Sequence, residues 1–240
     1  MISERELAQY FHSFWQEQFP LLNPSFMRRY NAQEWERVHA PEGYPIRPVP
    51  PGKNIERFDL VAELAFEWAA LAFDPGTNRE AACQAALRRV AALQGSAEIA
   101  APTSHEIAEA NALCDTYHHF FNTVIKGSQL RFRPLIKGAG LLNRMEGDFC
   151  SEDTLFEVKT VNRNLLSSDL RQVIIYLVAG NHSREYAWKR YCIFNPRIGI
   201  YFDGEVSDLL GYLSGRTPPE CINSVVDALM EREQPLEAKF

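Results

Sequence analysis

Long hydrophobic runs and closely spaced cysteine pairs are missing from this chain of 240 residues. No apolar run approaches the roughly 18 residues that cross a bilayer, so no membrane span is expected. The opening sequence MISERELAQYF has charges where a secretion signal would be apolar, which favours a cytoplasmic protein. The five cysteines contain no CxxC pair, which argues against a zinc site and against a disulfide framework. The expected class is a globular cytoplasmic protein with reduced thiols.

Glycine-rich nucleotide-binding motifs are absent as well. The glycines between residues 138 and 147 form neither G-x-G-x-x-G nor a P-loop, which excludes the common NTPase classes. His118 and His119 are adjacent and would point about 100° apart on a helix, so they cannot share a metal. Cys114 and His118 have helical spacing, but no orienting partner is evident. A buried thiol beside a histidine is therefore favoured over a catalytic pair.

Acidic residues outnumber basic ones, 31 to 25, and the net charge is −6. The basic residues nevertheless gather in the middle of the chain. The segment 126–197 has 12 Lys and Arg against 7 Asp and Glu, a local charge of +5, so the rest carries −11. A basic middle between acidic ends is what a phosphate-binding site on an acidic protein would have. Within it, Arg131 and Arg133 share a predicted strand face, where they contact phosphates or form a solvated surface.

Hydrophobic periodicity predicts that residues 1–100 form a mostly helical N-terminal region. The expected helices cover 3–18, 56–73 and 77–94, and the last begins with a capping box of Thr77 and Glu80. The small-residue stretch 95–103 is the predicted domain boundary.

From Ser104 onward the pattern predicts a helix, three strands, a helix and two strands. This order indicates an α/β fold in which helices flank a small mixed sheet. The core is assigned to residues 101–215, and a C-terminal helix and tail to 216–240. The expected helices are 104–126, 169–179 (capped by Ser167 or Ser168), 205–213 and 219–233; the expected strands are 130–136, 147–150, 154–161, 190–194 and 198–202, with a turn at Asp203 and Gly204.

The sequence GDFCSEDTLFEVKTV, residues 147–161, contains two charged residues in an otherwise apolar strand. In a strand over 154–161 alternate side chains share a face, so Glu157 and Lys159 lie together, opposite Phe156. Charged side chains are costly among apolar neighbours unless they are paired or bind a ligand. The pair is therefore a candidate site, with a surface ion pair as the structural alternative.

A predicted hairpin brings a second carboxylate to the same place. Asp148 precedes Glu157 by nine residues, and a turn over 150–153 puts the two on neighbouring strands. Adjacent carboxylates repel each other, and Mg²⁺, or Mn²⁺ in its place, relieves that repulsion through oxygen ligands that include the backbone carbonyl of Val158. Lys159 would then hold the attacking water or stabilise the pentacovalent phosphate, which predicts a metal-dependent phosphodiesterase.

Asp148 followed by Glu157-x-Lys159 resembles the metal-binding signature of the PD-(D/E)XK nuclease superfamily, with glycine in place of the usual proline before the aspartate. Gln172 and Tyr176, in the sequence DLRQVIIYL, resemble the Q-x-x-x-Y motif of the RecB-like branch. The two residues lie on one helix face. The alternative for this pair is the polar margin of an amphipathic helix.

The resemblance covers residues 104–202. It implies a restriction-endonuclease-like αβββαβ core, Mg²⁺ dependence and cleavage of nucleic acid. It also implies that Gln172 and Tyr176 support the catalytic residues, and that Glu106 or Glu109, on the first helix, adds a metal contact. Glu109 is included in the predicted metal set, and the choice between the two stays open.

The sequence thus predicts an Mg²⁺-dependent deoxyribonuclease that acts in prokaryotic anti-phage defence or DNA repair. DNA is the expected partner, together with a protein of a defence or repair complex, and the oligomeric state is left open. The alternative functions are a catalytically silent nucleic-acid-binding or assembly subunit on the same fold, and a structural protein with an incidental ion pair.

Overall fold

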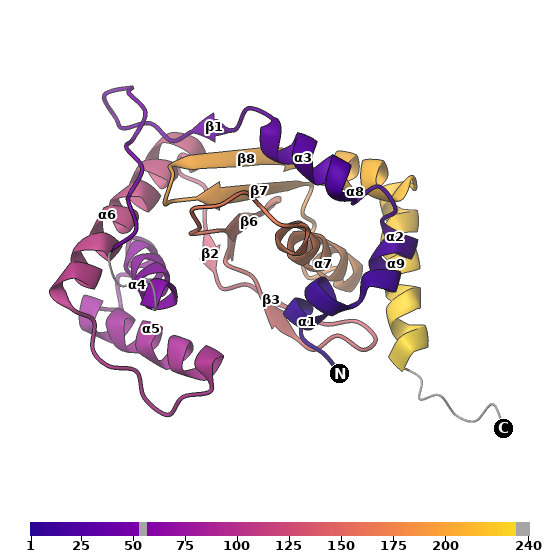
Figure 1. Ribbon diagram of the computed structural model, residues 1–240, viewed down its shortest axis with the longest axis horizontal. Coiled ribbons are helices and arrows are strands. Elements are labelled where there is room, and N and C mark those ends of the chain that lie inside the picture. Colours follow the sequence, from indigo (N-terminus) through magenta and orange to yellow (C-terminus); the bar gives the residue numbers. More distant parts are fainter. Residues whose placement is uncertain (53–56, 234–240) are drawn as a thin grey trace.

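A mixed six-stranded sheet lies at the centre of the structure, with helices on both of its faces (Figure 1). The structure is a computed structural model that describes residues 1–52 and 57–233. Its α/β class agrees with the prediction from sequence. Within the described residues no helix has the length and apolar character needed to span a membrane.

The strand order in the sheet is β1-β8-β7-β6-β5-β2. β6 and β7 run parallel, and the other four neighbouring pairs are antiparallel. A separate antiparallel pair contains β3 (Leu135–Ile136) and β4 (Met145–Glu146). The bounds in the large sheet are β1 (Glu36–Arg37), β2 (Arg131–Phe132), β5 (Phe149–Cys150), β6 (Thr154–Val158), β7 (Arg190–Asn195) and β8 (Ile200–Glu205).

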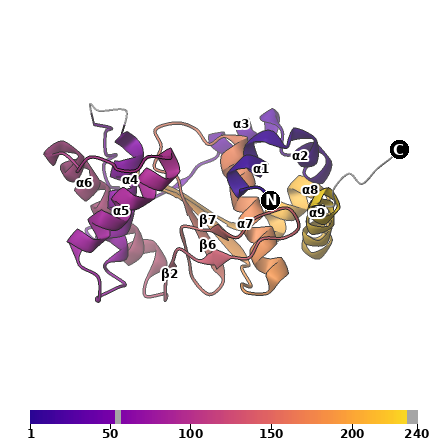
Figure 2. The same ribbon diagram turned by 90° about the horizontal axis from the view of Figure 1, so that it is seen from below.

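Two groups of helices cover opposite sides of the sheet (Figure 2). The first group shares one apolar cluster, which includes Leu7, Leu155 and Val226. The second shares another cluster, which includes Leu64, Phe120 and Phe156. The first group is α1 (Glu4–Tyr10), α2 (His12–Gln18), α3 (Pro24–Ala32), α7 (Ser167–Ser183), α8 (Val206–Ser214) and α9 (Pro218–Glu233); the second is α4 (Phe58–Ala70), α5 (Arg79–Gln94) and α6 (Ser104–Phe120).

Helix α7 connects the two parallel strands and is apolar on most of its surface. Nine of its residues between Leu170 and Gly180 are buried, because the sheet, α1 and α9 all pack against it. On the opposite side of the sheet the core is aromatic. The rings of Phe149 and Phe156 stack at 4.7 Å, as do those of Phe120 and Phe194 at 4.1 Å. The strands between these clusters are therefore buried on both faces.

The expected boundary at 95–103 does not separate two cores. Helices α1–α3 belong to the cluster formed around α7, whereas α4 and α5 belong to the cluster formed with α6. Residues 1–100 therefore contribute to both sides of one sheet. Composition marks the linker correctly as irregular, but it carries no information about which distant elements the flanking helices contact.

Two predicted elements are interrupted. The helix expected over 3–18 breaks at Phe11, whose φ of −90° and ψ of 59° are not helical. The strand expected over 130–136 divides into β2 and β3, because Arg133 has a positive φ of 52° and Pro134 follows it. The helix expected over 104–126 ends as an α-helix at Phe120 and continues as a π-helical turn, Phe121–Ile125.

Several predicted ends are displaced by one or a few residues. Asn78, and not Thr77, caps α5, while Thr103 with Glu106 forms the capping box of α6. The turn expected at Asp203 and Gly204 is instead part of β8, where a Cβ on Gly204 would lie 2.9 Å from the ring of Tyr191. Helix α3 and strands β1 and β4 were not predicted; the expected helix start at residue 56 and the tail 234–240 lie outside the described residues.

Candidate active site

The hairpin of β5 and β6 brings Asp148 and Glu157 to the same end of the sheet. Phe149 pairs with Phe156, and the register continued by one residue places Asp148 opposite Glu157. The backbone N–H of Val158 donates to Asp148 Oδ2 at 2.6 Å, which fixes the aspartate against the second strand. The predicted juxtaposition of the two carboxylates therefore follows from local pairing.

Glu157 is a buried carboxylate with one strong partner. Only 3% of the residue is exposed, and its Oε1 lies 2.7 Å from Lys159 Nζ. Its Oε2 is buried and has no hydrogen-bond partner among the described residues. Burial raises the pKa of Glu157 to about 8, and the charge of Asp148 adds to this against the opposing effect of Lys159. The surface ion pair considered as an alternative is therefore excluded.

Asp148 is half-buried, unlike Glu157. Burial raises the pKa of its carboxyl, an effect that the Val158 N–H and three nearby cations oppose. Those cations are Lys159, Arg133 and Arg5, the last of which lies on α1. A buried and a half-buried carboxylate thus lie side by side, and the pKa values of both are raised because the nearby cations do not fully offset the cost of burying two anions.

Lys159 is held by a chain of side-chain hydrogen bonds that reaches into α7. Its Nζ donates to Gln172 Oε1 at 2.7 Å, and Gln172 Nε2 donates to the Tyr176 hydroxyl at 2.8 Å. The i, i+4 spacing on α7 allows this contact, and Tyr176 is itself buried. The pair is therefore connected to Lys159, and is not the polar margin of a surface helix.

The N-terminus of α7 is anchored next to this chain. Asp169 accepts a hydrogen bond from the Leu166 N–H at 2.8 Å, pairs with Arg163 at 2.7 Å and lies 4.0 Å from Lys159 Nζ. Asp169 thus has the capping role that the sequence assigned to Ser167 or Ser168. The Lys159 N–H donates to the carbonyl of Phe194, so the lysine extends β6 at the carboxyl end of the parallel pair, where α/β proteins commonly carry their sites.

A charged network that the sequence did not predict borders Asp148. Arg133 pairs with Glu63 and Glu67 of α4 and with Glu146 of β4, and Arg89 of α5 pairs with Glu63 and Glu146. Three carboxylates therefore face two guanidinium groups. The backbone N–H of Arg133 also donates to the Asp148 carbonyl at 2.8 Å. Arg133 is consequently not the free phosphate contact considered from the sequence.

Glu63 is the acid of this network whose pKa is raised. Burial raises its pKa to about 7, and the charges of Glu67 and Asp148 act in the same direction against the two arginines. The only sequence signal for this role is the i, i+4 spacing of Glu63 and Glu67 in an apolar helix. Their partners are distant in sequence, so the spacing alone does not identify them.

We expect Glu63→Gln to flatten the dependence of stability on pH. The folded pKa of about 7 exceeds the value of 4.5 without burial, so stability is full below 4.5 and is lost as the pH rises toward 7. In thermal unfolding with EDTA, the parent Tm should fall by a few degrees over that window, and the variant should fall less. Exposed Glu80→Gln is the control; parallel curves for all three proteins would contradict the assignment.

Glu109 does not join the predicted metal set. Its Oε1 lies 2.7 Å from Arg197 Nη1, and its Oε2 accepts from the Gly52 N–H at 2.8 Å. Glu106 serves the capping box at Thr103 and lies 3.4 Å from Arg57. Both glutamates of α6 therefore have structural partners, and the prediction of Glu109 as a ligand is corrected.

Asp148 and Glu157, the remaining predicted carboxylate ligands, fit a hard divalent cation. In the part of the chain that the structure describes, no group of three or more Asp, Glu, His or Cys side chains is arranged to bind a metal. Asp148 and Glu157 nevertheless provide two carboxylates, and Mg²⁺ usually binds few carboxylates and keeps several waters. The unpartnered Glu157 Oε2 and the raised pKa values of both acids fit a place where a cation would be favourable. Val158 stays a predicted carbonyl ligand.

The cysteine–histidine pair has the structural role expected from the sequence. Cys114 Sγ lies 3.8 Å from His118 Nε2, and burial raises the thiol pKa to about 11. Such a thiol is scarcely ionised at neutral pH and is a poor nucleophile.

Comparisons of the chain with family models, with curated proteins and with solved structures gave no match.

Proposed function

We propose that the protein is a metal-dependent nuclease that hydrolyses phosphodiester bonds of DNA. The observation that carries this proposal is the continuous contact from Glu157 through Lys159 and Gln172 to Tyr176. A buried lysine held between a carboxylate and an amide, beside a second carboxylate, is an arrangement suited to phosphoryl chemistry. An incidental ion pair would not need the supporting helix.

The order of elements supports the same proposal. Within the large sheet, helix α6 is followed by the antiparallel strands β2, β5 and β6, then by α7 and the parallel strand β7; the separate pair β3 and β4 is inserted between β2 and β5. Apart from this inserted pair, the order agrees with the αβββαβ order that the resemblance to the PD-(D/E)XK superfamily implies. The acid–acid–lysine residues lie on the second and third of those strands, or directly beside them, where that superfamily would place them.

Asp148 and Glu157, with the Val158 carbonyl, would hold Mg²⁺ or Mn²⁺, which supplies an activated water and neutralises charge on the phosphodiester. Lys159 supplies the fixed positive charge. Neighbouring Glu157 and Asp169 raise its pKa against the effect of burial, so it stays an ammonium group and is not a base. An ammonium has three N–H donors, and Glu157 and Gln172 use two of them. The third is left for a phosphate oxygen or the attacking water.

Incubation of supercoiled plasmid and of linear single-stranded DNA with Mg²⁺ tests this function. We expect cleavage by the parent protein, loss of cleavage with EDTA, and no cleavage by Lys159→Met. Exposed Lys126→Met makes the same chemical change outside the site and should cleave like the parent. Metal-independent cleavage, or none of either substrate, would contradict the proposal. A role in prokaryotic defence or repair, with a partner protein, rests on the resemblance alone and is tested by the genes adjacent to this one.

A further inference from the structure

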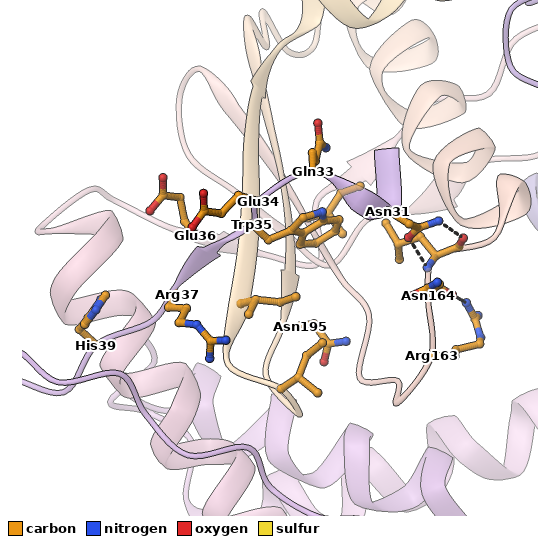
Figure 3. Close-up of a pocket in the computed structure, with 14 residues that line it drawn as sticks. Asn31, Gln33, Glu34, Trp35, Glu36, Arg37, His39, Arg163, Asn164 and Asn195 are labelled. Carbon is orange, nitrogen blue, oxygen red and sulfur yellow. Dashed lines mark hydrogen bonds between the residues drawn. The ribbon is translucent and has the colours of Figure 1, made fainter. Parts of the chain in front are cut away.

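A pocket of about 500 Å³ lies beside the site, between strand β1 and the loop that joins β6 to α7 (Figure 3). Its lining includes Ile193 of β7, a residue that is itself fully buried. Its rim is polar and comes from two distant segments of the chain, residues 31–39 and 163–165. The volume is within the range of small-molecule sites and is sufficient for one nucleotide.

This pocket adjoins the candidate catalytic residues. In the parallel register Ile193 is the partner of Glu157, so the two backbones are about 5 Å apart and the side chains share a face. On the other side, Arg163 lies at the rim and pairs with Asp169, which is 4.0 Å from Lys159 Nζ. The pocket thus adjoins residues that contact Lys159 or pair with Glu157.

Two asparagines hold the walls in place. Asn31 of α3 donates to the Leu165 carbonyl and accepts from its N–H, at 3.0 and 2.9 Å. Asn195, which is buried, donates to the Val161 carbonyl at 2.8 Å and accepts from the Arg197 N–H. The loop between β6 and α7 is thus fixed at both of its ends, so the pocket is formed before any ligand binds.

The side chains that line this pocket suit a nucleotide. Arg37 is exposed, makes no ion pair among the described residues, and points toward the side of Asn195, whereas Glu36 points away (Figure 3). Arg163 provides a second cation across the pocket. Trp35 is only partly buried and presents aromatic surface between them. Guanidinium groups recognise phosphate, and aromatic rings bind unpaired bases without sequence preference.

We propose that this pocket binds the unpaired nucleotide next to the scissile phosphodiester. Arg37 contacts its phosphate, and Trp35 contacts its base. The assignment rests on the proposed function, since it takes the polynucleotide cleaved at Lys159 as the ligand. It explains why a segment outside the αβββαβ elements, α3 and β1, is attached to the sheet edge beside the site.

The test compares Arg37→Ala with Arg88→Ala, which removes an exposed arginine of α5 that does not line the pocket. The dissociation constant for a fluorescein-labelled single-stranded 12-mer is measured by anisotropy at several salt concentrations. We expect Arg37→Ala to bind about fivefold more weakly and to lower the slope of log Kd on log salt by about 0.7, the value for one phosphate contact. Arg88→Ala should match the parent.

A 12-mer that carries 5-iodouracil locates the base directly. Irradiation should crosslink it to Trp35, identified by mass spectrometry of the tryptic peptides, without the need for a variant that disturbs the fold. Crosslinks only elsewhere, or equal binding by Arg37→Ala and the parent, overturn the pocket assignment. If the parent cleaves DNA but shows these results, the proposed function stands without the pocket. If it crosslinks at Trp35 but never cleaves, the catalytic proposal alone fails.

Discussion

Lys159→Met should lower the rate of DNA cleavage by about 10²–10³-fold or more, because it removes the ammonium that pairs with Glu157 and also acts on Asp148. Methionine keeps most of the length of lysine, so the packing against α7 changes little. The initial rate with saturating Mg²⁺ and plasmid measures the effect. DNA affinity, which depends on many phosphate contacts, should change far less than the rate.

Variants along the hydrogen-bond chain should give graded losses. Gln172→Leu leaves Lys159 charged but removes the amide that orients it, so we expect about a tenfold loss. Tyr176→Phe keeps the ring and removes only the hydroxyl that Gln172 contacts, so its effect should be smaller still. Equal rates for Gln172→Leu and the parent would mean that Lys159 needs no support from α7.

The stability of Lys159→Met has to be measured alongside its activity. Removal of the ammonium leaves Glu157 buried without a cation, which is costly if the carboxyl stays ionised. Because burial already raises the pKa of Glu157 to about 8, we expect the acid to take up a proton at neutral pH instead. A variant that unfolds near the assay temperature would not test catalysis, so the assay is run well below its Tm.

Mg²⁺ should raise the Tm of the parent protein by about 5–11 °C when present at a hundred times its dissociation constant. Ligand binding at that ratio stabilises the folded state by about 2.7 kcal/mol, and 1 kcal/mol corresponds to about 2–4 °C for a chain of this size. The physical reason is that the cation neutralises Asp148 and Glu157, whose carboxyl pKa values are both raised by burial. Thermal unfolding with Mg²⁺, Mn²⁺ or EDTA measures it.

Glu157→Gln should abolish that shift, since it removes one of the two carboxylates. Without metal the same variant should be at least as stable as the parent, because an amide is not repelled by Asp148. Glu152→Gln changes an exposed residue of the hairpin turn and should keep the full response to Mg²⁺. If Glu157→Gln and the parent respond alike, the cation binds elsewhere.

The part of the site predicted from sequence is the part that depends on short-range geometry. Asp148 and Glu157 meet because a tight turn sets the hairpin register, and Gln172 contacts Lys159 and Tyr176 because α7 begins shortly after β6. Strand alternation and the helical repeat describe such contacts well. The α/β class followed from the same two periodicities.

The features of the site that were not predicted from sequence depend on contacts between distant segments. Glu109 has the right residue type on the expected helix, but its two carboxylate oxygens contact Arg197 and the backbone N–H of Gly52 instead. Arg133 and Glu63 are 70 residues apart, and no local pattern connects them. The broken strand at Arg133 was missed for a similar reason, since its positive φ is maintained by tertiary contacts that include the bond to Asp148.

Arg133 connects Asp148 of the candidate site to helix α4, which supplies none of the candidate site residues. One guanidinium neutralises carboxylates from α4 and β4, while the backbone of the same residue holds Asp148. Without the charge of Arg133, the carboxylates of Glu63, Glu67 and Glu146 would lose an ion-pair partner close to Asp148, where the proposed cation would bind. Such a patch would compete for the ion and repel the incoming polyanion. We therefore expect the ion pairs of Arg133 to keep Glu63, Glu67 and Glu146 from forming a second cation site beside the proposed one.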